Sequence, residues 1–159
     1  DSIPDELREH FSGLWHQIAE QDYNDLTKAT RWVMQLPSFN MQTDPTIVYV
    51  GATGKREDHT LSNISLMAYY LDELLLNPVM VTDYGWFVAI HGDATVETFA
   101  RQQVSIFNVS CTRLQATGLR WKPWAFEQLW QGSLNEALAS EVKFLADGTY
   151  LVYRTFDKK

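Results

Sequence analysis

Residues 51–63 combine two glycines with an arginine, a carboxylate and a histidine directly after an apolar run. Their sequence is GATGKREDHTLSN, and the run TIVYV at 46–50 is typical of a buried strand. Ligands of open α/β sheets bind at the carboxyl ends of such strands, where backbone amides can face an anion. The P-loop motif is excluded, because it requires glycine at 49 and serine or threonine at 56, where this chain has Tyr49 and Arg56. These residues alone indicate a phosphate-handling loop of modest specificity.

Arg56 and Asp58 carry the most direct chemistry in this segment. Arginine binds phosphate oxygens through two parallel hydrogen bonds, so Arg56 is a candidate phosphate ligand. Asp58 would then bind a metal or accept a hydrogen bond from a substrate hydroxyl. The alternative is a surface ion pair between the two side chains, which has little energetic value.

A second acidic group, Asp22 and Asp25, lies at the expected start of a helix. Spacing alone favours an N-cap and a first-turn acid, because both are common and favourable with the helix dipole. The functional alternative is a magnesium ion, which prefers carboxylate oxygens and retains waters and phosphate oxygens. Lys28, one turn after Asp25, either pairs with that carboxylate or reaches a phosphate.

Four segments resemble the motifs of one family, the thiamine pyrophosphokinases, in the order in which that family has them. Residues 51–63 resemble its G-x-T-G-x-R-x-D-H-x-L-x-N segment, and Asp1-Ser2 resembles the end of its G-D-x-D-S metal motif. QDYNDLTK at 21–28 resembles Q-D-x-T-D-x-T-K, with Asn24 in place of the usual threonine. GLRW at 118–121 and GSLNE at 132–136 are similar to its G-L-x-W and S-N-E pair.

The resemblance implies a magnesium-dependent transfer of the β,γ-pyrophosphoryl group of ATP to the hydroxyl of thiamine, with release of AMP. It implies a homodimer with a shared active site, and Asp58 as the group that orients the attacking hydroxyl. The implied site residues are Asp1, Asp22 and Asp25 for Mg²⁺; Asp25, Arg56 and Asp58 for catalysis; Gly51, Thr53, Gly54, Arg56 and Lys28 for the ATP phosphates; and Gln21, Asp22, Trp121, Ser133 and Asn135 for thiamine.

Trp121 also has an ordinary interpretation, because a tryptophan usually belongs to the core, where we expect the other five. An indole face nevertheless suits the cationic thiazolium and the flat pyrimidine of thiamine. Ser133 and Asn135 would hydrogen-bond near the pyrimidine or simply form a polar turn, with Leu134 packed between them.

Two other functions stay open. A non-catalytic thiamine sensor would bind thiamine regardless of ATP and magnesium. A kinase that transfers a single phosphoryl group would make thiamine monophosphate and ADP. Residue spacing does not separate attack at the β phosphorus from attack at the γ phosphorus.

The elements that must position these residues divide into two regions. Helices are expected from Pro4 to Ala19, over 26–36 and over 60–75, around the strand at 46–50. Short β-rich runs then follow that are typical of an antiparallel sandwich, at 79–84, 86–91, 94–98, 103–109, 112–116 and 149–156. We therefore predict the C-terminal portion of a Rossmann-like α/β domain that binds ATP and Mg²⁺ over 1–77, and a thiamine-binding β-sandwich over 78–159.

Composition limits the partners. The 159 residues carry a net charge of −7, which argues against a nucleic-acid ligand. Apolar runs are too short for a membrane span. The single cysteine, Cys111, excludes an internal disulfide and fits a reducing cytoplasm. Because the chain begins inside a motif and without a methionine, we expect Asp1 to be an internal residue of a longer protein.

Overall fold

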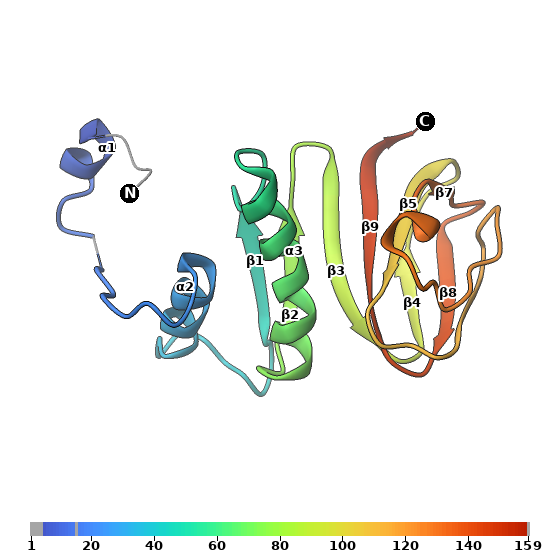
Figure 1. Ribbon diagram of the computed structural model, residues 1–159, viewed down its shortest axis with the longest axis horizontal. Helices are drawn as coiled ribbons and strands as arrows, with labels where there is room; N and C mark the ends of the chain where they lie inside the picture. The colour runs from blue at the N-terminus through green and yellow to red at the C-terminus, as the bar shows by residue number, and fades with distance from the viewer. Residues whose placement is uncertain (1–4, 15, 159) are drawn as a thin grey trace.

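The computed structural model describes residues 5–14 and 16–158, so Asp1 lies outside the described residues. A mixed sheet of six strands runs through the molecule (Figure 1). Its first pair, β1 and β2, is parallel, and the other neighbours are antiparallel. In sheet order the strands are β1 (Thr46–Val50), β2 (Asn77–Val81), β3 (Gly85–His91), β9 (Thr149–Lys158), β5 (Gln102–Asn108) and β7 (Asn135–Glu136).

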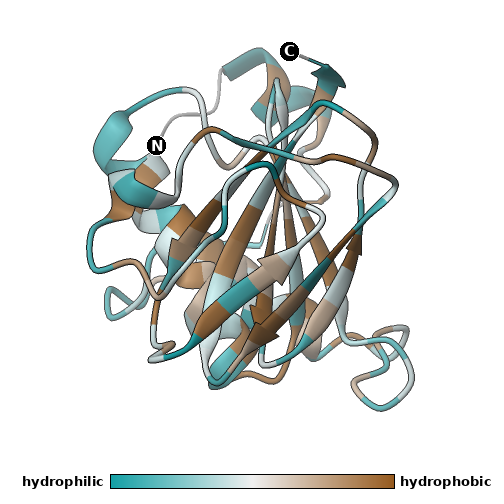
Figure 2. Cartoon of the chain, turned by 90° about the vertical axis from the view of Figure 1, so that its right-hand side faces the viewer, coloured by the Kyte–Doolittle hydropathy of each residue, from teal (hydrophilic) through white to brown (hydrophobic). Residues whose placement is uncertain are grey.

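A second sheet of three antiparallel strands completes a sandwich. It consists of β4 (Ala94–Glu97), β8 (Glu141–Ala146) and β6 (Leu114–Thr117). The core between the sheets contains Val104 and Ile106 of β5, Val142 and Phe144 of β8, and Val152 of β9, each at most 1% exposed. Figure 2 shows hydrophobic residues along the strands of this end of the molecule. The expected antiparallel sandwich is confirmed.

The helices lie toward the end of the six-stranded sheet that carries β1 (Figure 1). They are α1 (Asp5–His10), α2 (Asp25–Met34) and α3 (Glu57–Asp72), with a short 3-10 turn η1 (Leu129–Gly132) near β7. Helix α3 connects the parallel strands β1 and β2, as expected of an α/β unit. A second core joins Tyr49, Met67 and Tyr70 to Met80 and Leu151. The expected combination of an α/β portion and a β-sandwich is confirmed, while one continuous sheet crosses the predicted boundary at residue 77.

The helix expected from Pro4 to Ala19 is wrong in its extent. Helix α1 ends at His10, and residues 16–21 form neither helix nor strand. An apolar stripe stabilises a helix only when it packs, and no residue of α1 is buried. Phe11 and Leu14 are 44% and 73% exposed, and Gly13 further weakens helical structure.

Two other elements differ from expectation. Helix α3 begins at Glu57, so Asp58 lies in its first turn rather than in a loop. Strand β8 was not among the expected strands, although its residues alternate between exposed and buried positions. None of the helices in the described ranges is both long and apolar enough to cross a membrane.

Asp147, in the turn between β8 and β9, ties that turn to the start of β6. Its carboxylate accepts hydrogen bonds from Thr112 N (2.9 Å), Thr112 Oγ1 (2.6 Å) and Arg113 N (2.8 Å). The Thr112 hydroxyl, followed by the Arg113 amide, lowers the pKa of Asp147 from 3.8 to about 2. A lowered folded-state pKa adds stability that is fully present above the unfolded-state pKa and is lost as the pH falls through the folded-state value.

We expect Asp147→Asn to lower the melting temperature at pH 7, because the Nδ2 of asparagine, unlike the Oδ2 that it replaces, cannot accept a hydrogen bond from the Thr112 hydroxyl. The difference from the unaltered protein should shrink as the pH falls from 3.8 toward about 2. Circular dichroism melts at several pH values measure this, with the exposed carboxylate variant Asp157→Asn as the control. A difference that stays constant over that interval would contradict the role of Asp147.

Candidate functional site

The predicted site residues form two groups at opposite edges of the six-stranded sheet. One group lies on α2, the loop 51–56 and the start of α3, beside β1. The other lies in the segment 121–135, beside β7 (Figure 1). Because β1 and β7 are the two edge strands of six, five strand spacings separate them, or about 24 Å.

Helix α2 is held against β1 and α3 by two buried hydroxyl pairs. Thr27 Oγ1 lies 2.8 Å from Tyr70 Oη, and Thr30 Oγ1 lies 2.9 Å from Tyr49 Oη. The two tyrosine rings stack with centroids 5.6 Å apart. Burial raises the pKa of Tyr49 to about 12, so its hydroxyl stays protonated and able to donate. These contacts fix the helix that carries the first acidic group.

The N-cap of α2 is Asn24, not Asp22, so the expected capping role of Asp22 is wrong. Asn24 Oδ1 accepts a hydrogen bond from Thr27 N (2.9 Å). Asp25 is the first-turn acid, as expected, and its side chain is fully exposed. Asp22 and Gln21 are exposed in the preceding turn, where Glu20 accepts the Asp22 amide at 2.9 Å.

Lys28 lies between two carboxylates beside α2. Its Nζ is 3.7 Å from Glu20 Oε1 and 3.8 Å from Asp25 Oδ1, and its side chain is only 12% exposed. A cavity of about 380 Å³ next to it is lined by Leu14, His16, Ile18, Asp25, Lys28, Ala29 and Trp32. The structure therefore shows the ion pair, and a phosphate contact of Lys28 stays a prediction.

The loop after β1 depends on glycine for its backbone. Gly51 and Gly54 have φ angles of 71° and 89°, a region that other residues rarely adopt. Thr53 is partly buried between them. Arg56 ends the loop and is the N-cap residue of α3, without a side-chain cap.

Arg56 and Asp58 form a two-point ion pair. Arg56 Nε donates to Asp58 Oδ1 (3.1 Å) and Arg56 Nη2 to Asp58 Oδ2 (2.7 Å). This hydrogen bonding holds the pKa of Asp58 below its usual range. Both side chains are mostly exposed, and such exposed pairs contribute little to stability. Separating these two side chains would therefore cost little free energy.

The carboxylates beside α2 are the candidates for the predicted magnesium site. Within residues 5–14 and 16–158, no three His, Cys, Asp or Glu side chains are grouped to hold a metal. Magnesium needs only one or two carboxylates when waters and substrate phosphates complete its shell. The exposed carboxylate of Asp25 fits that requirement, with Asp22 in the preceding turn.

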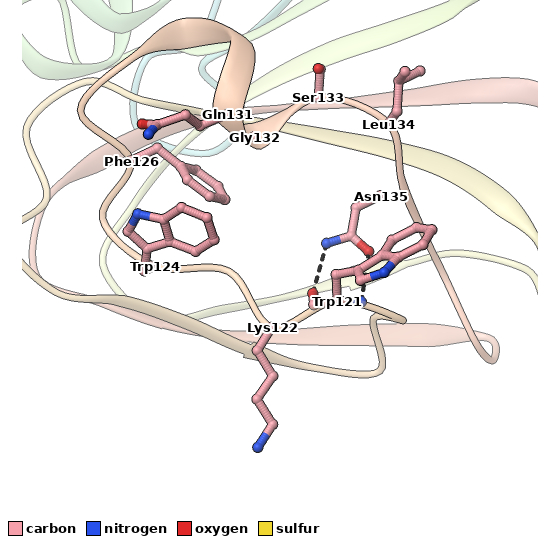
Figure 3. A pocket seen from close by; sticks show the side chains of 9 residues that line it. All are labelled: Trp121, Lys122, Trp124, Phe126, Gln131, Gly132, Ser133, Leu134 and Asn135. Atoms are coloured by element: carbon pink, nitrogen blue, oxygen red, sulfur yellow. Dashed lines mark hydrogen bonds between the residues drawn. The ribbon is translucent and has the colours of Figure 1, made fainter.

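The second group surrounds a cavity of about 370 Å³ (Figure 3). Trp121 and Trp124, 54% and 55% exposed, lie on different sides of this cavity, with Trp124 beside Phe126. Two indole faces suit a flat or cationic ligand. The lining residues are Trp121, Lys122, Trp124, Phe126, Gln131, Gly132, Ser133, Leu134 and Asn135.

Asn135 fixes the backbone of Trp121. Its Nδ2 donates to Trp121 O (2.7 Å), and its Oδ1 accepts from Trp121 N (3.2 Å). Ser133 is exposed, and its hydroxyl donates to Trp130 O (2.8 Å). Leu134 does not pack as expected, because it is 67% exposed in a left-handed conformation with φ 63°.

Trp124 and Phe126 were not among the predicted site residues. The expectation that the other tryptophans are buried is wrong for Trp32, Trp124 and Trp130, which are 37%, 55% and 74% exposed, and Trp15 lies outside the described residues. The sequence signal for this cavity was the high density of aromatic residues in WKPWAFEQLW at 121–130. This stretch lacks the alternation of apolar and polar residues that is typical of a strand.

Gly132 lines the cavity at a position that has no room for a side chain. A Cβ at this position would lie 1.8 Å from Ile106 O and 2.8 Å from Phe126 Cδ2. We expect Gly132→Ala to destabilise the protein by about 1–3 kcal/mol, the usual cost of overpacking. Urea unfolding measures this. Gly13→Ala is the control, since nothing lies within 4 Å of its Cβ. Equal stability of the two variants would contradict the tight contact.

Both groups of site residues lie in segments that match known protein families. Residues 1–75 match the family described as thiamin pyrophosphokinase, catalytic domain, and residues 85–153 match thiamin pyrophosphokinase, substrate-binding domain. Thiamin pyrophosphokinase 1 of Caenorhabditis elegans is 30% identical over 83 residues, which are 52% of this chain and 33% of that protein. Thiamine pyrophosphokinase 1 of Oryza sativa subsp. japonica is 32% identical over 71 residues, 42% of this chain and 27% of that protein. The chain thus spans about a third or less of these curated relatives.

Solved structures share the fold over nearly all of the chain. The thiamine pyrophosphokinase of Bacillus subtilis has a TM-score of 0.75 at 20% identity, over 98% of this chain and 75% of that one. That of Geobacillus thermodenitrificans has a TM-score of 0.72 at 26% identity, over 98% and 74%. That of Candida albicans has a TM-score of 0.77 at 16% identity, over 99% and 70%.

Proposed function

The chain belongs to the thiamin pyrophosphokinase family, and we propose that it transfers the pyrophosphoryl group of ATP to thiamine. The products are thiamine diphosphate and AMP. The observation that carries this proposal is a pair of complementary sites on one fold. A glycine loop with exposed charged groups lies at the β1 edge, and an aromatic cavity lies at the β7 edge.

The β1 edge would handle the nucleotide. The Gly51–Gly54 turn would offer backbone amides to the phosphates, with Thr53, and Arg56 and Lys28 would add positive charge. Asp25 and Asp22, with Asp1, would hold Mg²⁺. The metal would neutralise negative charge on the phosphates. These groups orient the β phosphorus for attack and stabilise charge on its oxygens.

Asp58 would orient the attacking group. Once a phosphate occupies Arg56, the released carboxylate of Asp58 accepts a hydrogen bond from the thiamine hydroxyl. The hydroxyl oxygen forms a bond to the β phosphorus, and the bond from that phosphorus to the α–β bridging oxygen breaks. The hydroxyl proton is released to the solvent, and AMP leaves with the bridging oxygen as part of its phosphate.

Thiamine would be held between two subunits of a symmetric dimer. The separation of about 24 Å between the edge strands is too large for one chain to bring the Trp121 cavity to its own α2. A two-fold axis would place that cavity against the partner's α/β portion, where Gln21 and Asp22 contact thiamine. Leu134, which lines the cavity, is exposed, and so are Leu129 in η1 and Leu138 after β7, which supports an interface at this edge.

ATP and thiamine are the proposed partners, and the proposed compartment is the cytoplasm. Cys111 is a buried free thiol, and burial raises its pKa, so it is kept as an unreactive structural group. A buried free thiol favours a reducing compartment. The net charge of −7 argues against a nucleic-acid partner.

The test is the appearance of thiamine diphosphate when the full-length protein is incubated with ATP, magnesium and thiamine. Omission of ATP or of magnesium should abolish the product. Tight thiamine binding that is indifferent to both, without product, would replace the enzyme by a sensor. Formation of thiamine monophosphate would indicate a single-phosphoryl kinase.

A further inference from the structure

Two asparagines connect the start of α2 to the glycine loop. Asn24 Nδ2 donates to Asn63 Oδ1 (3.1 Å), and Asn63 Nδ2 donates to Ala52 O (2.8 Å). The other end of the Asn24 amide accepts from Thr27 N (2.9 Å). A continuous chain of hydrogen bonds therefore runs from the first turn of α2, across α3, to the loop 51–56.

The direction of this chain is fixed by its two backbone ends. Ala52 O can only accept, so Asn63 must point its Nδ2 toward the loop and its Oδ1 toward Asn24. Thr27 N can only donate, so Asn24 must turn its Oδ1 toward the helix and its Nδ2 toward Asn63. Each side chain must donate and accept at the same time. An aspartate at 24 would keep the cap but could not donate to Asn63.

The chain joins the two segments whose relative position matters most at the β1 edge. Asp25 and Lys28 follow Asn24 directly on α2, and Arg56 follows Ala52 in the loop. The hydroxyl pairs of Thr27 and Thr30 hold α2 against α3 and β1, and Asn24 adds a contact from the N-cap of α2 to Asn63 of α3. The loop has two glycines with open space around them, so its own backbone constrains it little.

We propose that Asn24 and Asn63 are positioning residues that set the carboxylate of Asp25 in register with the phosphate loop. This inference rests on the proposed function. It is also consistent with Asn24, which stands where the family usually has threonine. An asparagine amide and a threonine hydroxyl can each donate and accept a hydrogen bond at the same time. A misplacement of about 1 Å remote from the chemistry can cost about 100-fold in rate.

The test uses Asn24→Asp and Asn63→Ala in the full-length protein. Asn24→Asp keeps the cap, so its melting temperature should stay close to that of the unaltered protein. The matched control is Asn40→Asp, which adds the same charge and keeps the acceptor for Gln42 N and Thr43 N. We expect faster amide hydrogen exchange over residues 52–56 and a kcat lower by about 10- to 100-fold in both test variants. The KM for thiamine should not change.

A double variant tests whether the two asparagines act through one bridge. If one bridge acts, Asn24→Asp combined with Asn63→Ala should lower kcat no further than Asn63→Ala alone. Exchange and kcat that stay at the Asn40→Asp values in both single variants would overturn the inference. Absence of turnover in the unaltered protein would overturn the proposed function alone, because hydrogen exchange still decides whether the bridge holds the loop.

Discussion

Replacement of Asp25 by asparagine should lower turnover by about 100-fold or more and leave thiamine binding nearly unchanged. Changes in residues that only support metal ligands already cost about 10- to 100-fold, so loss of a ligand charge should reach at least the upper end. The side chain of Asp25 is fully exposed at the start of α2, so its removal disturbs no packing. Thiamine affinity should persist because Trp121 lies near the opposite sheet edge.

The measurement is kcat together with the thiamine dissociation constant from calorimetry. Asp5→Asn is a matched control, because Asp5, like Asp25, is an exposed aspartate at the first position of a helix. Turnover that survives in Asp25→Asn would refute the proposed metal role of Asp25. A parallel loss in Asp5→Asn would point to a general effect of charge instead.

Replacement of Trp121 by alanine should weaken thiamine binding by roughly 10- to 100-fold. Stacking of an aromatic base on an indole is worth about 1–3 kcal/mol, and about 1.4 kcal/mol corresponds to tenfold in affinity. The half-exposed indole lies at the cavity wall, and its backbone is held by Asn135, so the ring is available to a ligand. The thiamine cation adds a further attraction to the ring face.

Trp121→Phe separates stacking from packing, because phenylalanine keeps an aromatic face of smaller area. Its thiamine affinity, measured by calorimetry, should fall between those of the unaltered protein and Trp121→Ala. Unchanged affinity in Trp121→Ala would remove Trp121 from the binding site. An equal melting temperature of the three proteins would show that the fold is not responsible for the difference.

Much of the fold could be predicted because local patterns and packing agree. The β-branched run at 46–50 is a strand as expected, and α2 covers nearly its expected range. The first helix was overestimated, since apolar spacing indicates only the capacity to pack, and no residue of α1 is buried. Strand β8 was missed although Val142, Phe144 and Ala146 alternate into the core.

The arrangement of the site depends on long-range pairing that local patterns do not encode. Strand β9 is last in sequence, yet it lies between β3 and β5 and so increases the distance between the two site groups. The contact between Asn24 and Asn63 joins residues 39 positions apart. Residue types indicated Arg56 and Asp58 as candidates, but the ion pair between them could be established only from the geometry. The structure shows the ion pair, and the phosphate role stays a proposal.

The identity of the released nucleotide tests the central claim most directly. Phosphorus NMR of the full-length protein with ATP, magnesium and thiamine follows every phosphate species in one sample. Pyrophosphoryl transfer predicts one AMP for each thiamine diphosphate formed, without accumulation of ADP. Release of ADP with thiamine monophosphate, or thiamine binding without any nucleotide product, would contradict it.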